Sequence, residues 1–390
     1  MIMKSSLMYS MLAIMLIVVG CSPSHNEPNV PEKKVTFRYT LPDKWKDSKI
    51  AELNVEVKNK DTGVTKTFSL KGDKEMKVSL PGGIYDIGAT AKISDVEFRA
   101  HLSDFSIKAD TEITLDMYPV PHGSFVIREL FYSGATTTKG KKYLHCDYVI
   151  LTNNSDKTLY ADGLSFMGTG QNTKLASDEQ YSKVLPAVVA EFIFTIPGSG
   201  KDVPVPPGGD IVLAMEAKNH TETSTQAADL SKHANFEWFE PNERFQLTDN
   251  PNVPNMKIDF KESQTITKLH VGGYKSYCLI RMPKPINEVM VQDTIMYKAP
   301  NPKVPARPYP KIPMEWILDG VELFDGPNII TKALPSAVDK SHTYVTEKYK
   351  GYVVTRKVDY IVGDRKVYAD TNDSKRDFER DQASSLLSKR

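Results

Sequence analysis

Apolar and polar residues alternate in short runs along most of this chain. Residues 35–39, 53–57 and 76–80 place an apolar side chain at every second position, and turns rich in glycine or proline separate these runs. An alternation with period two is typical of a strand that buries one face. Residues 34–118 therefore predict a first domain of six or seven short strands arranged as a β-sandwich.

A second series of strand-like runs follows the stiff segment Pro119-Val120-Pro121, where we place a domain boundary. These runs lie at residues 125–131, 143–151, 159–164, 188–196, 211–214, 274–282, 314–324 and 351–360. They predict a second domain over residues 122–378, with long insertions at 168–187 and 216–312. The chain has 25 prolines, 22 glycines and no long segment with a period of 3.6 residues. This pattern predicts an all-β protein with many turns.

Two parts of the chain resemble known modules. Residues 80–85, with the sequence Leu-Pro-Gly-Gly-Ile-Tyr, resemble a turn of prealbumin-like (carboxypeptidase regulatory-like) domains, which are non-catalytic. Residues 149–156 and 161–164 resemble a strand, a turn and the next strand of a lamin-tail domain, which is an immunoglobulin-like sandwich. The resemblance implies a prealbumin-like β-sandwich at 34–118 and a larger lamin-tail-like sandwich with insertions at 122–378.

The N-terminus has the pattern of an export signal. Lys4 provides a positive charge, residues 7–19 form an apolar run, and the small Gly20 precedes Cys21. This ending resembles the lipobox of bacterial lipoproteins. The resemblance implies that residues 1–20 are a signal peptide and that Cys21 is acylated with chains such as palmitate. An ordinary signal peptide followed by a coincidental cysteine is the alternative.

Charge and cysteine content narrow the function classes. With 50 Lys and Arg against 49 Asp and Glu, the formal charge is +1, which gives no electrostatic argument for nucleic acid as a partner. Membrane affinity would come from the acyl chains, at about 0.8 kcal/mol per buried CH₂. Cys146 and Cys278 could pair in an oxidising compartment or stay buried free thiols. Residues 21–33 are expected to be a polar tether and 379–390 a charged tail.

Three short motifs suggest chemistry but lack required residues. Residues 198–201 resemble part of a phosphate-binding loop, without its first glycine and without Ser or Thr after the lysine. His145 and Asp147 are expected on one strand face, without a third metal ligand at a suggestive spacing. Residues 370–374 resemble the start of a calcium loop that lacks its later Gly and Glu. The sequence therefore predicts no catalytic residue, metal site or cofactor.

Aromatic residues and two surface motifs remain as candidates. Trp238 and Phe239, in the second insertion, are the best candidates for an exposed partner or ligand surface. Thr294 lies in an Asp-Thr-aliphatic sequence that resembles a bacterial O-glycosylation signal. Residues 299–313 contain six prolines, which favours an extended polyproline-like path. That segment is either a surface connection or a ligand strand for another protein.

The whole mature chain also resembles a family of uncharacterised Bacteroidota-type lipoproteins that join these two modules. The resemblance implies a lipid-anchored binding or interaction protein of the cell envelope. It would be accessory to an outer-membrane receptor barrel for nutrient or metal uptake, on either face of the outer membrane. A surface adhesin or structural lipoprotein is one alternative, and a hydrolase with its site in residues 216–312 is another. We expect a binding protein rather than an enzyme.

Overall fold

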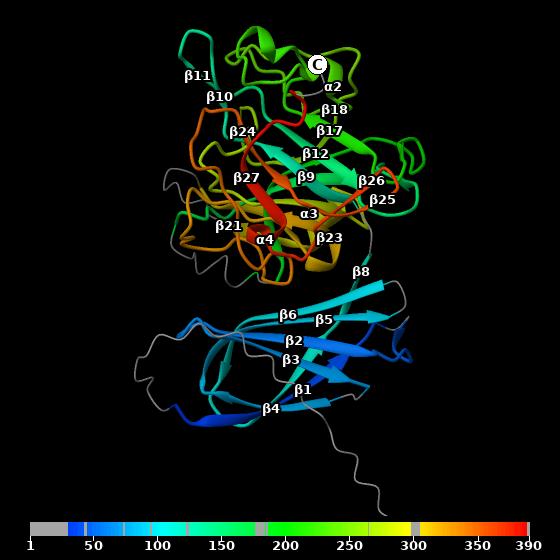
Figure 1. Cartoon of the computed structure of the whole chain (residues 1–390), viewed down its shortest axis with the longest axis vertical. Coiled ribbons are helices and arrows are strands. Elements are labelled where there is room, and N and C mark those ends of the chain that lie inside the picture. The colour runs from blue at the N-terminus through cyan, green and yellow to red at the C-terminus, as the bar shows by residue number, and fades with distance from the viewer. Residues whose placement is uncertain are drawn as a thin grey trace, which may run out of the picture. The chain divides into compact units, whose positions relative to one another are not determined.

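The chain forms two compact units in a computed structural model, Met1–Pro119 and Val120–Arg390, which are described separately below (Figure 1). The division falls inside the segment where the sequence places a domain boundary. The structure describes residues 30–42, 45–72, 75–93, 96–121, 125–175, 184, 186–263, 265–297 and 305–387. Cys21 and the expected signal peptide lie outside these residues.

Unit 1 consists of two antiparallel-rich sheets around one core. The three-stranded sheet has the order β4-β1-β7, and the five-stranded sheet has the order β3-β2-β5-β6-β8. The strands are β1 (Glu32–Thr40), β2 (Glu52–Asn59), β3 (Thr65–Lys71), β4 (Glu75–Pro81), β5 (Gly83–Ile93), β6 (Val96–Ile107), β7 (Thr111–Asp116) and β8 (Tyr118–Pro121). The alternation in the sequence is confirmed, because β2 and β7 bury every second side chain.

The turn between β4 and β5 is held by Tyr85 and Gly83. Tyr85 is buried in the core of unit 1, and its hydroxyl donates to the Pro81 carbonyl at 2.8 Å. A Cβ at Gly83 would lie 2.8 Å from the side-chain amide nitrogen of Asn59, so any larger residue there would have to displace the Asn59 side chain.

Unit 2 is a larger sandwich of a six-stranded and a seven-stranded sheet. The first has the order β18-β17-β12-β9-β24-β27; the second has the order β21-β22-β15-β14-β20-β23, with β19 paired to β15. Their strands are β9 (Phe125–Phe131), β12 (Tyr148–Asn153), β14 (Leu164–Thr169), β15 (Val188–Thr195), β17 (Asp210–Ala214), β18 (Phe236–Glu237), β19 (Lys257–Lys261), β20 (Tyr277–Arg281), β21 (Thr294–Tyr297), β22 (Arg307–Ile312), β23 (Ile317–Val321), β24 (Tyr352–Arg356) and β27 (Phe378–Ala383).

Smaller elements connect these strands. Three two-stranded ribbons pair β10 (Ala135–Thr136) with β11 (Lys142–Tyr143), β13 (Leu159–Tyr160) with β16 (Pro204–Val205), and β25 (Val358–Val362) with β26 (Arg365–Tyr368). The helices are short: η2 (His220–Glu222), α2 (Leu230–His233), α3 (Ile286–Gln292), η3 (Met314–Trp316) and α4 (Ser374–Asp377). Among the residues that the structure describes, no helix has the length and apolar character needed to cross a membrane.

The six-stranded sheet is covered on both faces. Its inner face contributes Ile127, Leu151 and Leu213 to a core shared with Phe166, Phe194 and Leu279 of the other sheet. On its outer face, Tyr148 and Val212 pack with Leu230, which belongs to the second predicted insertion. Every residue of β9 and β12 is consequently buried. An all-apolar strand pattern is expected when both faces are covered.

Buried ion pairs connect strands of the two sheets. Asp319 of β23 accepts from the guanidinium of Arg356 in β24 and from the backbone amide of Ile127 in β9, each at 2.6 Å. Arg356 also contacts Asp377 at 3.7 Å. Because both members of the pair are almost fully buried, removal of either would leave an uncompensated charge in the core.

Two other expectations from the sequence are resolved here. Cys146 and Cys278 are buried, unpaired thiols. Part of the proline-rich segment forms β22, which pairs with β15 and β21 and so belongs to the seven-stranded sheet. The expected polyproline-like path is therefore wrong for residues 307–312.

Candidate functional site

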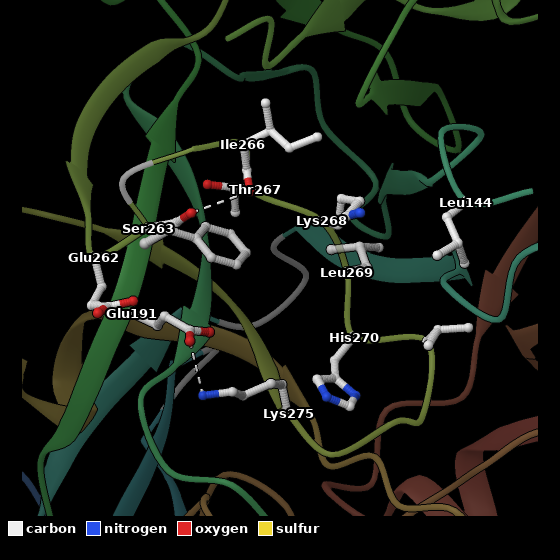
Figure 2. Close-up of a pocket in the computed structure, with 12 residues that line it drawn as sticks. Leu144, Glu191, Glu262, Ser263, Ile266, Thr267, Lys268, Leu269, His270 and Lys275 are labelled. Atoms are coloured by element: carbon white, nitrogen blue, oxygen red, sulfur yellow. Dashed lines mark hydrogen bonds and ion pairs between the residues drawn. The ribbon is translucent and has the colours of Figure 1, made fainter. Parts of the chain in front are cut away.

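A hollow of about 450 Å³ in unit 2 brings charged, polar and apolar side chains together (Figure 2). It lies between β15 and residues 262–263 and 265–271, which belong to the insertion at 216–312. Its lining residues are Leu144, Glu191, Phe192, Glu262, Ser263, Ile266, Thr267, Lys268, Leu269, His270, Val271 and Lys275. Apolar and charged side chains both face it, which is the usual composition of a small-ligand site.

Buried side chains hold the start of this segment in place. The Thr267 amide donates to the Glu240 carboxylate at 2.6 Å, and the indole N–H of Trp238 donates to the Thr267 carbonyl at 3.2 Å. The other Glu240 oxygen pairs with Lys261, whose ammonium also donates to the Thr265 carbonyl at 3.0 Å. A segment without regular secondary structure thereby has its backbone groups satisfied, as burial requires.

Trp238 was expected at the surface, and that prediction is wrong. Its side chain is 1% exposed and stacks on Phe194 with ring centroids 6.1 Å apart. Phe239, its neighbour, is half-buried. The insertion that carries Trp238 packs over the sandwich. The indole ring of Trp238 therefore lies in the core, and its N–H holds the Thr267 carbonyl next to the hollow.

Two further buried groups hold the middle of the segment. The Leu269 amide donates to the Asp147 carboxylate at 2.9 Å, and the His270 amide donates to the Tyr277 hydroxyl at 2.7 Å. Burial raises the pKa of Asp147 well above its ordinary value, and the bond from Leu269 opposes that rise. These contacts join residues that are 122 and 7 positions apart in the chain. They fix the backbone from which Lys268 and His270 project.

One wall of the hollow contains an ion pair. The Lys275 ammonium lies 3.0 Å from the Glu191 carboxylate and donates to the Gly170 carbonyl at 2.9 Å. Figure 2 shows this pair beside His270, with Glu262 next to Glu191. The Glu262 amide donates to the Glu191 carbonyl at 2.8 Å, so the two glutamates stand on adjoining backbone.

His270 presents a donor to the hollow. Its ring Nδ1 accepts from the amides of Gly272 and Tyr274, at 3.2 and 3.4 Å, which leaves the proton on Nε2. Burial, together with the positive charges of Lys275 and Lys348, lowers the pKa of His270 to about 4. At neutral pH His270 is therefore an uncharged N–H donor.

The polar groups of the site differ from those of a second hollow of about 360 Å³ in unit 2. That hollow is lined by Val203, Pro204, Val205, Pro206, Gly209, Asp210, Ile211, Asn235 and Phe236. Its Asp210 already accepts from Thr152 at 2.5 Å and from Arg128 at 3.2 Å, and the Asn235 side chain accepts from the Val212 amide at 2.8 Å. Polar groups engaged in this way leave the second hollow little to offer a ligand.

The phosphate-loop-like residues 198–201 have an internal partner. Three backbone amides of residues 200–203 donate to the Asp162 carboxylate at 2.9–3.1 Å. Burial raises the pKa of Asp162, but these bonds lower it by more, and the net shift is downward. Gly198 has φ +144°, and a Cβ there would lie 2.0 Å from Asp162. The glycine-rich loop therefore binds an anion of the chain itself.

Other sequence candidates have structural roles. Residues 145–146 form a turn before β12, so the prediction that His145 and Asp147 share a strand face is wrong. In the calcium-loop-like segment, Asp373 caps α4, and Asp377 accepts from the Thr371 amide at 2.8 Å. Thr294 is half-buried in β21, opposite Pro310. Within the described ranges, no group of three or more His, Cys, Asp or Glu side chains is placed to hold a metal ion.

Sequence reasoning located the insertion but missed the residues of the hollow. Lys268 and His270 carry no motif, and their partners come from distant strands. The weak signal available was the apolar spacing of Ile266, Leu269 and Val271, which suggests a segment held on one side by the core.

Comparison with known proteins gives a family and a fold. Residues 206–385 match the family described as "Protein of unknown function (DUF4876)". The crystal structure of a DUF4876 family protein from Bacteroides thetaiotaomicron superposes with a TM-score of 0.60 and 23% identity, covering 90% of this chain and 96% of that one. No curated protein matches the sequence.

Two other solved structures are much less similar. A streptococcal ancillary pilin has a TM-score of 0.18 and 11% identity, covering 48% of this chain and 51% of its own. A candidate adhesin from Bacteroides ovatus has a TM-score of 0.21 and 8% identity, covering 69% and 89%. Scores this low carry no argument about this protein. Residues 206–385 thus match an uncharacterised family, DUF4876, and the chain has the fold of a Bacteroides protein of that family.

Proposed function

We propose that this protein is a lipid-anchored binding protein of the bacterial cell envelope that captures a small solute in the hollow of unit 2. The observation that supports this proposal is the hollow itself, where a pinned backbone presents Lys268, His270 and Thr267 beside apolar walls. A site held by buried hydrogen bonds loses little entropy when it binds, because its groups are already ordered.

The anchor and the modules complete the proposal. Acylated Cys21 would hold the protein at the outer membrane, and the prealbumin-like unit 1 would act as a non-catalytic spacer. An accessory role beside an outer-membrane uptake receptor fits a tethered solute-binding unit, since tethering raises the local concentration of captured solute. This part rests on the resemblance to envelope lipoproteins and is an argument by analogy.

A hydrolase is the second candidate, because two carboxylic side chains, Glu191 and Glu262, line the hollow. Binding is favoured over hydrolysis by the state of the other groups. Glu191 is held by Lys275 at 3.0 Å, and the free ring nitrogen of His270 is a donor rather than a base. Incubating the protein with a compound that binds in the hollow distinguishes the two candidate functions. Recovery of the unchanged compound supports a binding protein, and a hydrolysis product supports a hydrolase.

Thermal unfolding of the full chain with a panel of small solutes tests the proposal. Val271 lines the hollow, so Val271→Trp should fill it and abolish any ligand-induced rise in Tm. Val203→Trp fills the second hollow and is the matched control. Leu144→Trp serves as a second blocking variant if Val271→Trp does not fold. The proposal fails if no solute raises Tm, or if the rise survives both blocking variants.

Membrane fractionation tests the anchor separately. Cys21→Ser should release the protein from membranes, because the thiol that would carry the acyl chain is gone. Retention of the variant in the membrane fraction would contradict lipid anchoring. It would not bear on the proposed binding of a solute in the hollow. Co-purification of a receptor barrel with the anchored protein is expected under the accessory role; purification of the anchored protein alone would contradict that role.

A further inference from the structure

Three lysines lie around His270: Lys275 is paired with Glu191, whereas Lys268 and Lys348 feel the charges of Asp147 and Asp325 without forming an ion pair among the described residues. Lys268 forms no ion pair with any carboxylate of the described residues, and its ammonium lies 5.2 Å from the centre of the Phe245 ring. Lys348, also without a carboxylate partner there, lies 5.2 Å from the Tyr274 ring, which in turn packs against His270 at 4.8 Å. The titration of His270 is shifted down by Lys275 and Lys348, which indicates a positive potential at its ring.

We infer that the hollow binds a small organic molecule through a single carboxylate, held by the Lys268 ammonium and the Nε2–H of His270. This inference rests on the proposed function and names its ligand class. Lys268 and His270 stand two residues apart on the pinned segment, and both line the hollow. Figure 2 shows both on this stretch of backbone.

A third polar group supports the assignment. Thr267 lines the hollow with more than nine-tenths of its surface buried, and its hydroxyl has no hydrogen-bond partner. A buried hydroxyl without a partner is costly, so a ligand that reaches it would gain from satisfying it. The apolar lining, with Ile266, Leu269 and Val271, would take the hydrocarbon part of the ligand.

The donors suit a carboxylate better than a phosphate. Phosphate sites generally use guanidinium groups, helix N-termini or clusters of free backbone amides. The lining of the hollow contains no arginine, and the amides of Gly272 and Tyr274 are already used by the His270 ring. One ammonium and one imidazole N–H match the single charge and two oxygens of a carboxylate.

Isothermal titration of the full chain with hexanoate, hexanamide, inorganic phosphate and glucose tests this inference. Hexanoate should bind at least about tenfold tighter than hexanamide, since only the acid offers a charged acceptor. Added salt should weaken the binding of hexanoate. Lys268→Gln should weaken it about tenfold, whereas Lys232→Gln, with an exposed lysine outside the hollow, should not change it.

Three results would overturn the inference: equal affinity for acid and amide, tighter binding of phosphate, or unchanged binding by Lys268→Gln. His270→Gln gives an independent check, because its amide keeps an N–H donor and should retain much of the binding that His270→Ala loses. Hexanoate could fail to bind while another solute raises the Tm of the chain, with that rise lost in Val271→Trp. The carboxylate inference is then wrong, and the proposed function stands. If no solute stabilises the chain, both fail.

Discussion

Replacement of Trp238 by Phe tests whether the core supports the hollow. The phenyl ring can keep most of the packing against Phe166 and Phe194, but it has no N–H for the Thr267 carbonyl, now bonded at 3.2 Å. Leaving that carbonyl without its buried partner costs about 1–3 kcal/mol. The smaller ring adds a cavity term of about 1 kcal/mol. We therefore expect the free energy of unfolding of unit 2 to fall by about 2–4 kcal/mol.

Urea unfolding, monitored by hydrogen exchange, measures the change in the free energy of unfolding of each unit separately. With a urea slope of about 2–3 kcal/mol per M, the midpoint of unit 2 should fall by roughly 1 M. The amides of Leu269 and His270 should lose protection more than the strand amides, because they lie on the loosened segment. Trp45→Phe is the control, since Trp45 is partly buried against the core of unit 1. An unchanged unit 2 midpoint with unchanged protection of these amides would refute the reasoning.

Three further predictions concern the core of unit 2. Arg356→Met should lower its free energy of unfolding by about 3–5 kcal/mol in urea, because it leaves Asp319 buried without a counter-charge; a loss below about 1 kcal/mol would contradict this view of the pair. Burial raises the pKa of Asp339 to about 6 from 3.8, so the folded state keeps a proton that the unfolded chain releases. Stability should therefore fall by up to about 3 kcal/mol as the pH rises from about 4 to 6, and Asp339→Asn should remove this component in urea titrations at each pH. Cys146 and Cys278 are buried and free, so in Cys21→Ser protein a thiol reagent should react with them only after unfolding; rapid reaction of the native protein would contradict their burial.

The strands were predictable because their signal is local. In unit 1, alternation alone located β1, β2 and β4 to within a few residues. In unit 2, the run at β9 marked a strand, but its Arg128 and Glu129 gave no sign that both of its faces are covered. The cover comes from Ala227, Ala228 and Leu230, roughly 100 residues later, and no periodicity reports a contact over such a separation.

The hollow could not be predicted either, because it also depends on contacts between residues far apart in the chain. Its backbone is held by Asp147, Trp238, Glu240 and Tyr277, which lie in different elements and come together only in the folded sandwich. Trp238 illustrates why the prediction of an exposed surface was wrong. A tryptophan in an insertion was assigned to the surface, whereas the insertion packs over the sandwich and supplies part of its core. The lipobox-like pattern at Cys21 is the opposite case, because an export signal is predicted from local sequence alone; that prediction concerns residues outside the described part of the chain.

A crystal structure of the full chain with hexanoate tests the central claim most directly. We predict the acid in the hollow between β15 and residues 262–263 and 265–271, with its carboxylate within hydrogen-bond distance of Lys268 Nζ and His270 Nε2 and its chain against Leu269. Hexanoate found in the second hollow, beside Val203 and Phe236, or bound with its carboxylate away from His270, would contradict the account.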